Sequence, residues 1–131
     1  MSPILSVALA LAMQAAQPPS EAAEATAPRD SVALDSLTLE QRTALRCGVG
    51  FAIVAQGQAE GDARAAAFPP LASRGREFFV RATARLMDET GGDRAAIGDL
   101  VSAQVAEFAA RPSAVEEAML ACLLLLDASG L

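Results

Sequence analysis

The chain has no histidine, lysine, tryptophan or tyrosine among its 131 residues, and this removes several kinds of chemistry. Without an imidazole, neither a Ser-His-Asp triad nor a Cys-His pair can form, because in both the imidazole takes the proton of the nucleophile. Nearly all catalytic zinc sites also depend on histidine ligands. The sequence therefore predicts a protein that is not an enzyme and that holds no metal or cofactor.

Positive charge is also scarce. The ten basic residues, all arginines, are outnumbered by sixteen acidic residues, which gives a formal net charge of −6. Nucleic-acid binding draws much of its affinity from cations placed on phosphates, so an acidic chain is a poor candidate. We expect no nucleic-acid partner.

The first residues have the layout of a secretory signal peptide. An apolar run, ILSVALALAM, spans residues 4–13 and is followed by small residues. Ala10 and Ala12 fit an A-x-A cleavage site, and cleavage near Ala16 fits as well. The run is shorter than the about 20 apolar residues of a transmembrane helix. We predict a signal peptide over residues 1–16, a periplasmic or secreted protein, and no membrane span in the mature chain.

The remaining chain divides into a linker and one domain. Residues 17–36 are rich in alanine, proline, serine and acidic residues, which predicts a flexible linker. Residues 37–131 contain four segments of helical periodicity and no strand-like alternation. The sequence therefore predicts an all-α fold, a small bundle of four helices.

Capping signals predict where the four helices begin and end. Thr38 and Gln41 form a capping box at the start of the first helix, expected over residues 37–57 and ended by glycine. Residues 57–68 are expected to be a loop. The next helices are expected to begin at Pro69-Pro70, at Asp93, and at Ser113, which forms a second capping box with Glu116. Their short connections predict that the last three helices are antiparallel neighbours.

The last helix contains the most apolar stretch of the domain. Residues 119–126, MLACLLLL, are apolar on every side. A helix of this kind is buried on all sides. We expect it to be the central helix of the domain or part of a dimer face, and the sequence leaves monomer and homodimer open.

The two cysteines are predicted to form a disulfide. Cys47 and Cys122 lie on apolar faces of the first and last helices, and an oxidising compartment favours their pairing. The chain-entropy model gives about 4 kcal/mol for so long a loop. A free buried thiol is the next alternative. Catalysis by Cys47 is disfavoured, because the adjacent Arg46 does not face it on a helix and no histidine is present.

Three further motifs have simple structural explanations. Gly48-Val49-Gly50 lacks the third glycine and the preceding strand of a dinucleotide-binding loop, so the glycines are expected to allow close helix packing. Residues 88–93, DETGGD, offer three carboxylates for calcium, but their spacing is not that of an EF-hand and favours a helix end, a turn and a cap. The arginines of the second helix could instead bind an anionic partner, and Arg74, Arg81 and Arg85 are the candidate partner surface.

Three segments, RCGVGFAIV, PPLASRGREFFVRATARLMDETG and ACLLLLDAS, give the chain a family resemblance. Together they resemble a group of small, uncharacterised, exported helical proteins of sphingomonad-type alphaproteobacteria. The most specific part is GREFFVRATARLMDETG, residues 75–91. The resemblance implies export and a helical fold, and it assigns no activity and no site residue.

Two classes of function follow from the sequence. The first is a non-enzymatic periplasmic protein that binds another protein. The alternative is a carrier of a small apolar ligand or lipid, held in the bundle between Phe51, Phe79, Phe108 and the leucines of the last helix. An interaction protein should present a contiguous apolar patch at its surface, whereas a carrier should enclose an apolar cavity.

Overall fold

The computed structural model describes residues 32–131, and all the regular secondary structure in them is helical. A 3-10 helix, η2 (Leu34–Ser36), precedes α1 (Leu39–Glu60), α2 (Ala63–Ala66), α3 (Arg74–Thr90), α4 (Arg94–Ala110) and α5 (Ser113–Ala128). Within this part of the chain there is no strand, so the predicted all-α class with four long helices is confirmed. The predicted signal peptide, residues 1–16, and residues 17–31 of the predicted linker lie outside the described residues.

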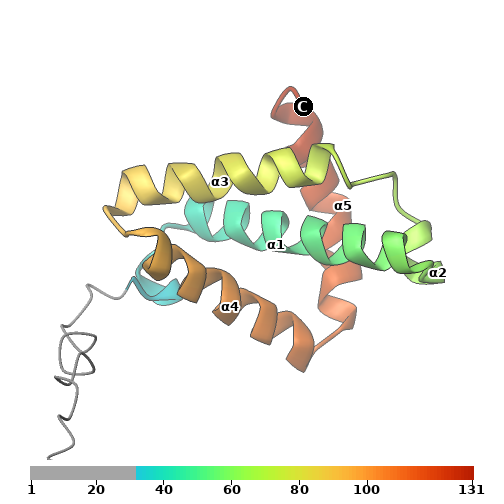
Figure 1. The fold of residues 1–131 in the computed structure, drawn as a ribbon, viewed down its shortest axis with the longest axis horizontal. Coiled ribbons are helices and arrows are strands. Elements are labelled where there is room, and N and C mark those ends of the chain that lie inside the picture. Colours follow the sequence, from blue (N-terminus) through green and yellow to red (C-terminus); the bar gives the residue numbers. More distant parts are fainter. Residues whose placement is uncertain (1–31) are drawn as a thin grey trace, which may run out of the picture.

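Helix α1 is the centre of the bundle. It contacts each of the other four α-helices, and its most extensive contact is with α3. Figure 1 shows α3 running antiparallel beside α1, α4 turning back beneath, and α5 crossing behind α1 at a steep angle. The predicted antiparallel arrangement therefore applies to α3 and α4 but is wrong for α5.

The core consists of two clusters on different sides of α1. One joins α1 to α3 and α5 through Phe51, Phe78 and Met119, and the other joins α1 to α3 and α4 through Leu45, Leu86 and Leu100. Residues 47–51 of α1 are buried without interruption, so that helix is covered on all sides over more than one turn. The expectation that residues 119–126 form the central helix is wrong.

The start of α1 is as predicted, and its end is not. The backbone N–H of Gln41 donates to Oγ1 of Thr38, and the backbone N–H of Thr38 donates to Oε1 of Gln41, which confirms the capping box. The helix then continues past Gly57 to Gly61, whose φ of 77° ends it in the left-handed conformation. Gly57 instead gives α2 room, because a Cβ there would lie 2.8 Å from Cβ of Ala65.

The predicted loop and the start of the second helix both need correction. Residues 57–68 include the last turn of α1 and the short helix α2. Helix α3 begins at Arg74 and not at Pro69-Pro70. The side chain of Gln58 explains this, because its amide donates to the carbonyl of Pro69 and accepts from the N–H of Leu71. These bonds keep the proline pair outside the helix.

The start of α4 is at the predicted position, but the predicted cap of α5 is not formed. Helix α3 ends at Gly91, and Oδ1 of Asp93 accepts from the N–H of Ala96, 2.8 Å away, as a cap of α4. At α5, Pro112 already has the helical angles φ −58° and ψ −31°. Ser113 is therefore inside the helix and not at the extended N-cap position, so the predicted capping box with Glu116 is absent.

The end of the predicted linker belongs to the domain. Val32 and Leu34 are half-buried against the cluster that contains Leu86 and Leu100. Leu37, which follows η2, is buried. The folded domain thus begins by residue 32, whereas the predicted linker extended to residue 36.

Candidate interaction surface

The predicted disulfide joins the central helix to the crossing helix. Cys47 on α1 and Cys122 on α5 are bonded, with their Cα atoms 5.2 Å apart and both side chains buried. This separation is within the usual range for disulfides. The prediction is confirmed, and both sulfurs belong to the core rather than to an exposed reactive site.

The glycines beside Cys47 are packing positions. A Cβ on Gly48 would lie 3.3 Å from Cα of Phe79 on α3, and a Cβ on Gly50 would lie 2.8 Å from Cε of Met119 on α5. Both glycines are buried within a continuous helix. They let two neighbouring helices approach the α1 backbone, as the sequence predicted.

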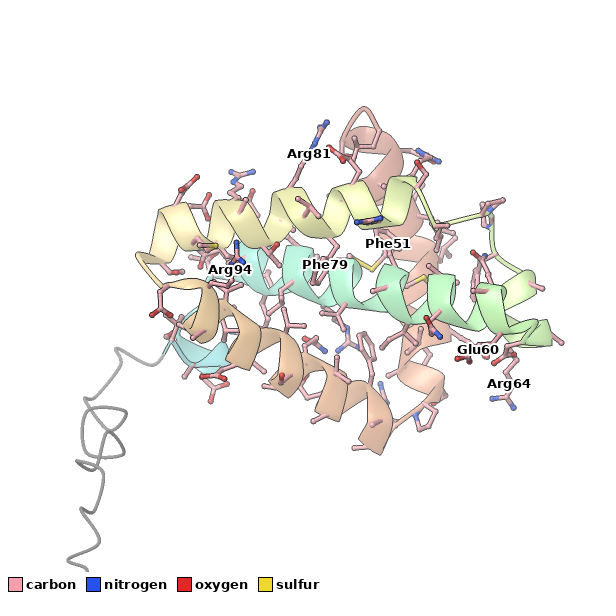
Figure 2. All side chains as sticks on the ribbon, viewed as in Figure 1. Phe51, Glu60, Arg64, Phe79, Arg81 and Arg94 are labelled. Carbon is pink, nitrogen blue, oxygen red and sulfur yellow. A yellow bond between two sulfur atoms is a disulfide. The ribbon has the colours of Figure 1, made fainter. Side chains whose placement is uncertain are left out.

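The three arginines predicted as a partner surface are each matched by a carboxylate. Arg81 lies 2.9 Å from Glu77, and Arg85 lies 2.6 Å from Glu89. Figure 2 shows Arg81 projecting from α3 away from α1. Because each guanidinium faces an acidic side chain, this side of α3 does not present an unbalanced basic patch.

Arg74 differs from Arg81 and Arg85 because its contacts are with the last residues of the chain. Its Nε donates to the backbone carbonyl of Leu131, 2.7 Å away, and its Nη2 lies 2.8 Å from Oδ1 of Asp127. These contacts hold the beginning of α3 against the end of α5. Arg74 therefore stabilises the position of α5 in the bundle.

Glu89 and Arg85 connect the end of α3 to the beginning of α1. Nε2 of Gln41 donates to Oε2 of Glu89, 3.0 Å away, and this hydrogen bond is the main reason why the pKa of Glu89 is below its ordinary value. The bond from Arg85 lowers the pKa of Glu89 further, and Glu89 in turn raises the pKa of Arg85. Glu89 is thus occupied by protein donors.

The acidic stretch DETGGD is distributed over the turn between α3 and α4. Glu89 faces Gln41 and Arg85, whereas Asp93 caps α4. Across residues 32–131, no group of three or more histidine, cysteine or carboxylate side chains is placed to hold a metal ion. The helix end at Gly91 and the cap at Asp93 are as the sequence predicted.

Helix α5 presents an apolar face to solvent. Met119, Cys122 and Leu126 point into the core, but Leu120 and Leu124 are 77% and 65% exposed. These two leucines are one turn apart, on the same face. The exposed residues Ala121 and Ala128 and the half-buried Leu125 adjoin them around the helix, and we call these five residues the α5 apolar face.

The sequence offered two functional expectations: an apolar surface patch for an interaction protein, and a ligand site between three phenylalanines for a carrier. The α5 apolar face is the kind of surface patch expected of an interaction protein. Of the rings expected to enclose a ligand, Phe51 lies in one core cluster, and Phe79 and Phe108 lie in or against the other. Phe51 packs edge-to-face on Phe78 with ring centroids 5.3 Å apart.

Two glutamine side chains have structural roles that no sequence pattern indicates. Gln58 holds the α2 region through bonds to the carbonyls of Ala65, Phe68 and Pro69 and to the N–H of Leu71. Gln104 is 1% exposed on α4, where its Nε2 donates to Glu107. A glutamine within a helix carries no pattern that distinguishes these roles from simple solvation.

No family model, curated protein or solved structure matches this chain. The resemblance to exported sphingomonad proteins therefore stays a prediction. Among the helices of residues 32–131, none has the length and apolar character needed to cross a membrane.

Proposed function

We propose that the chain is an exported, non-enzymatic helical protein that binds another protein through the α5 apolar face. The observation that carries the proposal is the exposure of Leu120 and Leu124 on a helix whose opposite side is fully buried. Burying a leucine side chain contributes about 1.5–3 kcal/mol, so two leucines offer a partner substantial binding energy. Small alanines beside them let a partner helix approach closely.

The partner that best fits this face is a basic amphipathic helix of another protein. An apolar helix face is commonly covered by a second helix that presents its own apolar side. The net charge of −6 repels a second copy of the same chain and attracts a partner of opposite charge. We therefore expect leucine-like residues on the contacting side of the partner and lysine or arginine at its margins.

A designed peptide pair tests this binding function. The probe is a helix of about 18 residues, or five turns, with leucine on one face and lysine on the other. We expect it to bind the purified protein, and a leucine–glutamate version of equal length to bind much more weakly. The double substitution Leu120→Ser/Leu124→Ser should weaken binding of the lysine peptide about tenfold or more, because both leucines lose their apolar contact.

The matched control for this test is Val80→Ser. Val80 is 52% exposed on α3, away from the α5 apolar face. Equal binding by the wild type and the Leu120→Ser/Leu124→Ser variant would contradict the proposal. Sedimentation velocity at several concentrations tests the other occupant, and a dimer that the double variant abolishes would assign the face to a second copy.

The proposed location rests on the apolar run at residues 4–13 and on the disulfide. Disulfides persist mainly in oxidising compartments, which supports export. The intact mass of the protein from the periplasmic fraction should show cleavage after Ala12 or near Ala16, and the loss of two hydrogens. A full-length, reduced protein in the cytoplasmic fraction would contradict export.

The non-enzymatic part of the proposal rests on the residue types present. The chain has no histidine, and its two cysteines are bonded to each other. The remaining acid–base groups are carboxylates, many of which face arginines. Binding, rather than group transfer, is the activity that these side chains support.

A further inference from the structure

A pocket lies on a different part of the molecule from the α5 apolar face. It has a volume of about 350 Å³ and is bounded by the second half of α1, by α2, by the end of α4 and by the beginning of α5. Its walls are mainly apolar and include Phe68, Val105, Phe108, Pro112 and Val115. The volume is at the lower end of the range of about 300–1,000 Å³ that is typical of small-molecule sites.

The wall that α2 contributes is held in place by the protein itself. Nε2 of Gln58 donates to the carbonyls of Ala65 and Phe68, at 3.1 and 3.2 Å. Ala65 packs directly over Gly57, where a side chain would clash. Since these contacts fix α2 against α1, the pocket exists before a ligand arrives, and a preformed site loses less entropy on binding.

The charged groups at the pocket disfavour an anionic ligand. Nε of Arg64 on α2 lies 3.8 Å from Oε1 of Glu116 on α5, so these two charges compensate each other. Figure 2 shows Arg64 extending outward from the α2 end of the bundle. The remaining carboxylate, Asp62, accepts from the N–H of Arg64 as the cap of α2. An anionic ligand would meet two carboxylates, and the apolar walls offer no partner to an ionic group.

The exposed side chain of Val105 indicates that the pocket is open to solvent. It is 42% exposed although it is a large apolar residue, and it lines the pocket together with the fully buried Phe108. Covering the exposed side of Val105 would remove apolar surface from water, which favours binding by about 25 cal/mol per Å².

We propose that this pocket binds a small uncharged apolar molecule, of the size of two or three aromatic rings or a short hydrocarbon chain. The site keeps the ligand class that the sequence suggested for a carrier, but it lies under α2 rather than between the three phenylalanines. It shares neither Leu120 nor Leu124 with the α5 apolar face, so it is independent of the proposed protein-binding function.

A fluorescence titration with N-phenyl-1-naphthylamine, a neutral apolar fluorophore, tests the proposal. We expect saturable binding of one molecule, with a blue shift of the emission. Ala109 lines the pocket but is exposed, so Ala109→Phe should fill the site without disturbing the core. That variant should bind the fluorophore about tenfold more weakly.

Two control variants make the result decisive. Ala103→Phe introduces the same ring at an exposed position on the opposite side of α4, and it should bind like the wild type. Leu120→Ser/Leu124→Ser should also bind like the wild type. Thermal unfolding followed by circular dichroism checks that Ala109→Phe is folded. Absence of saturable binding to the wild type, equal binding by Ala109→Phe, or loss of binding in the double variant would each overturn the proposal.

Discussion

Helices α1 and α5 are both rich in apolar residues, yet the bundle uses them in opposite ways. The stretch 47–51 of α1 contains two glycines and is buried on every side. The stretch 119–126 of α5 is more apolar, yet it leaves Leu120 and Leu124 in solvent. The comparison teaches that a central position requires room for neighbours: Gly48 and Gly50 provide that room on α1, whereas the leucines of α5 occupy it themselves.

Truncating a core aromatic residue of α1 should destabilise the domain far more than truncating an exposed leucine of α5. Phe51 is fully buried, and Phe51→Ala should lower the free energy of unfolding by about 3–5 kcal/mol, because it leaves a cavity against Phe78. Leu124→Ala should change it by less than about 0.5 kcal/mol. Urea unfolding measures both, and similar losses in the two variants would mean that the Leu124 side chain is buried.

Removing the disulfide tests how strongly α5 depends on α1. The bond closes a loop with a sequence separation of 75 residues, and Cys47→Ala/Cys122→Ala should lower the free energy of unfolding by about 2–4 kcal/mol. Amide hydrogen exchange should accelerate more in α5 than in α4, since the bond ties α5 to the centre. A reductant should destabilise the wild type and leave the double variant unchanged; if the wild type is equally insensitive, the stabilising role is wrong.

A smaller loss of stability should distinguish the N-terminus of α1, which is capped, from that of α5, which is not. Thr38→Ala removes a formed capping box from α1 and should cost about 1 kcal/mol in thermal or urea unfolding. Ser113→Ala, at the start of α5, should cost much less, because the Ser113 side chain makes no cap bond. Equal costs would indicate that the α5 capping box forms in solution.

The smallest change should be in the pKa of Glu89, whose carboxyl group connects α3 to α1. Glu89 has a lowered pKa in the folded chain, so its stabilising contribution is present above the ordinary carboxyl pKa and is lost as the pH falls through the lowered value. Gln41→Ala should raise the pKa of Glu89 towards the ordinary value, since the hydrogen bond from Gln41 is the largest single cause of the lowering, and Arg85→Ala should raise it as well. A carbon-detected NMR titration of the Glu89 carboxyl group measures this shift, and no change in Gln41→Ala would refute the assignment.

Local signals in the sequence predicted much of the fold. The Thr38 capping box, the end of α3 at Gly91, the Asp93 cap and the disulfide pair all depend on short-range chemistry or on the apolar side of a helix. Long-range contacts could not be predicted in this way. Gln58 delays the start of α3 by bonds across 11 and 13 residues, and no local pattern identifies them.

The candidate surface was only partly visible in the sequence. Residues 119–126 stand out in the sequence as its most apolar helical stretch, but apolar composition alone does not say which side of a helix the neighbours cover. That choice is made by the small residues of α1 and by Arg74, which fixes the end of α5 through Asp127 and Leu131.

An NMR map of the binding surface tests directly whether α5 carries the interaction. Adding the leucine–lysine peptide to the ¹⁵N-labelled protein should shift the amide signals of residues 117–128, centred on Leu120 and Leu124, and leave those of α4 in place. Shifts spread evenly over the acidic surface, or concentrated on α3, would contradict the claim that α5 carries the interaction.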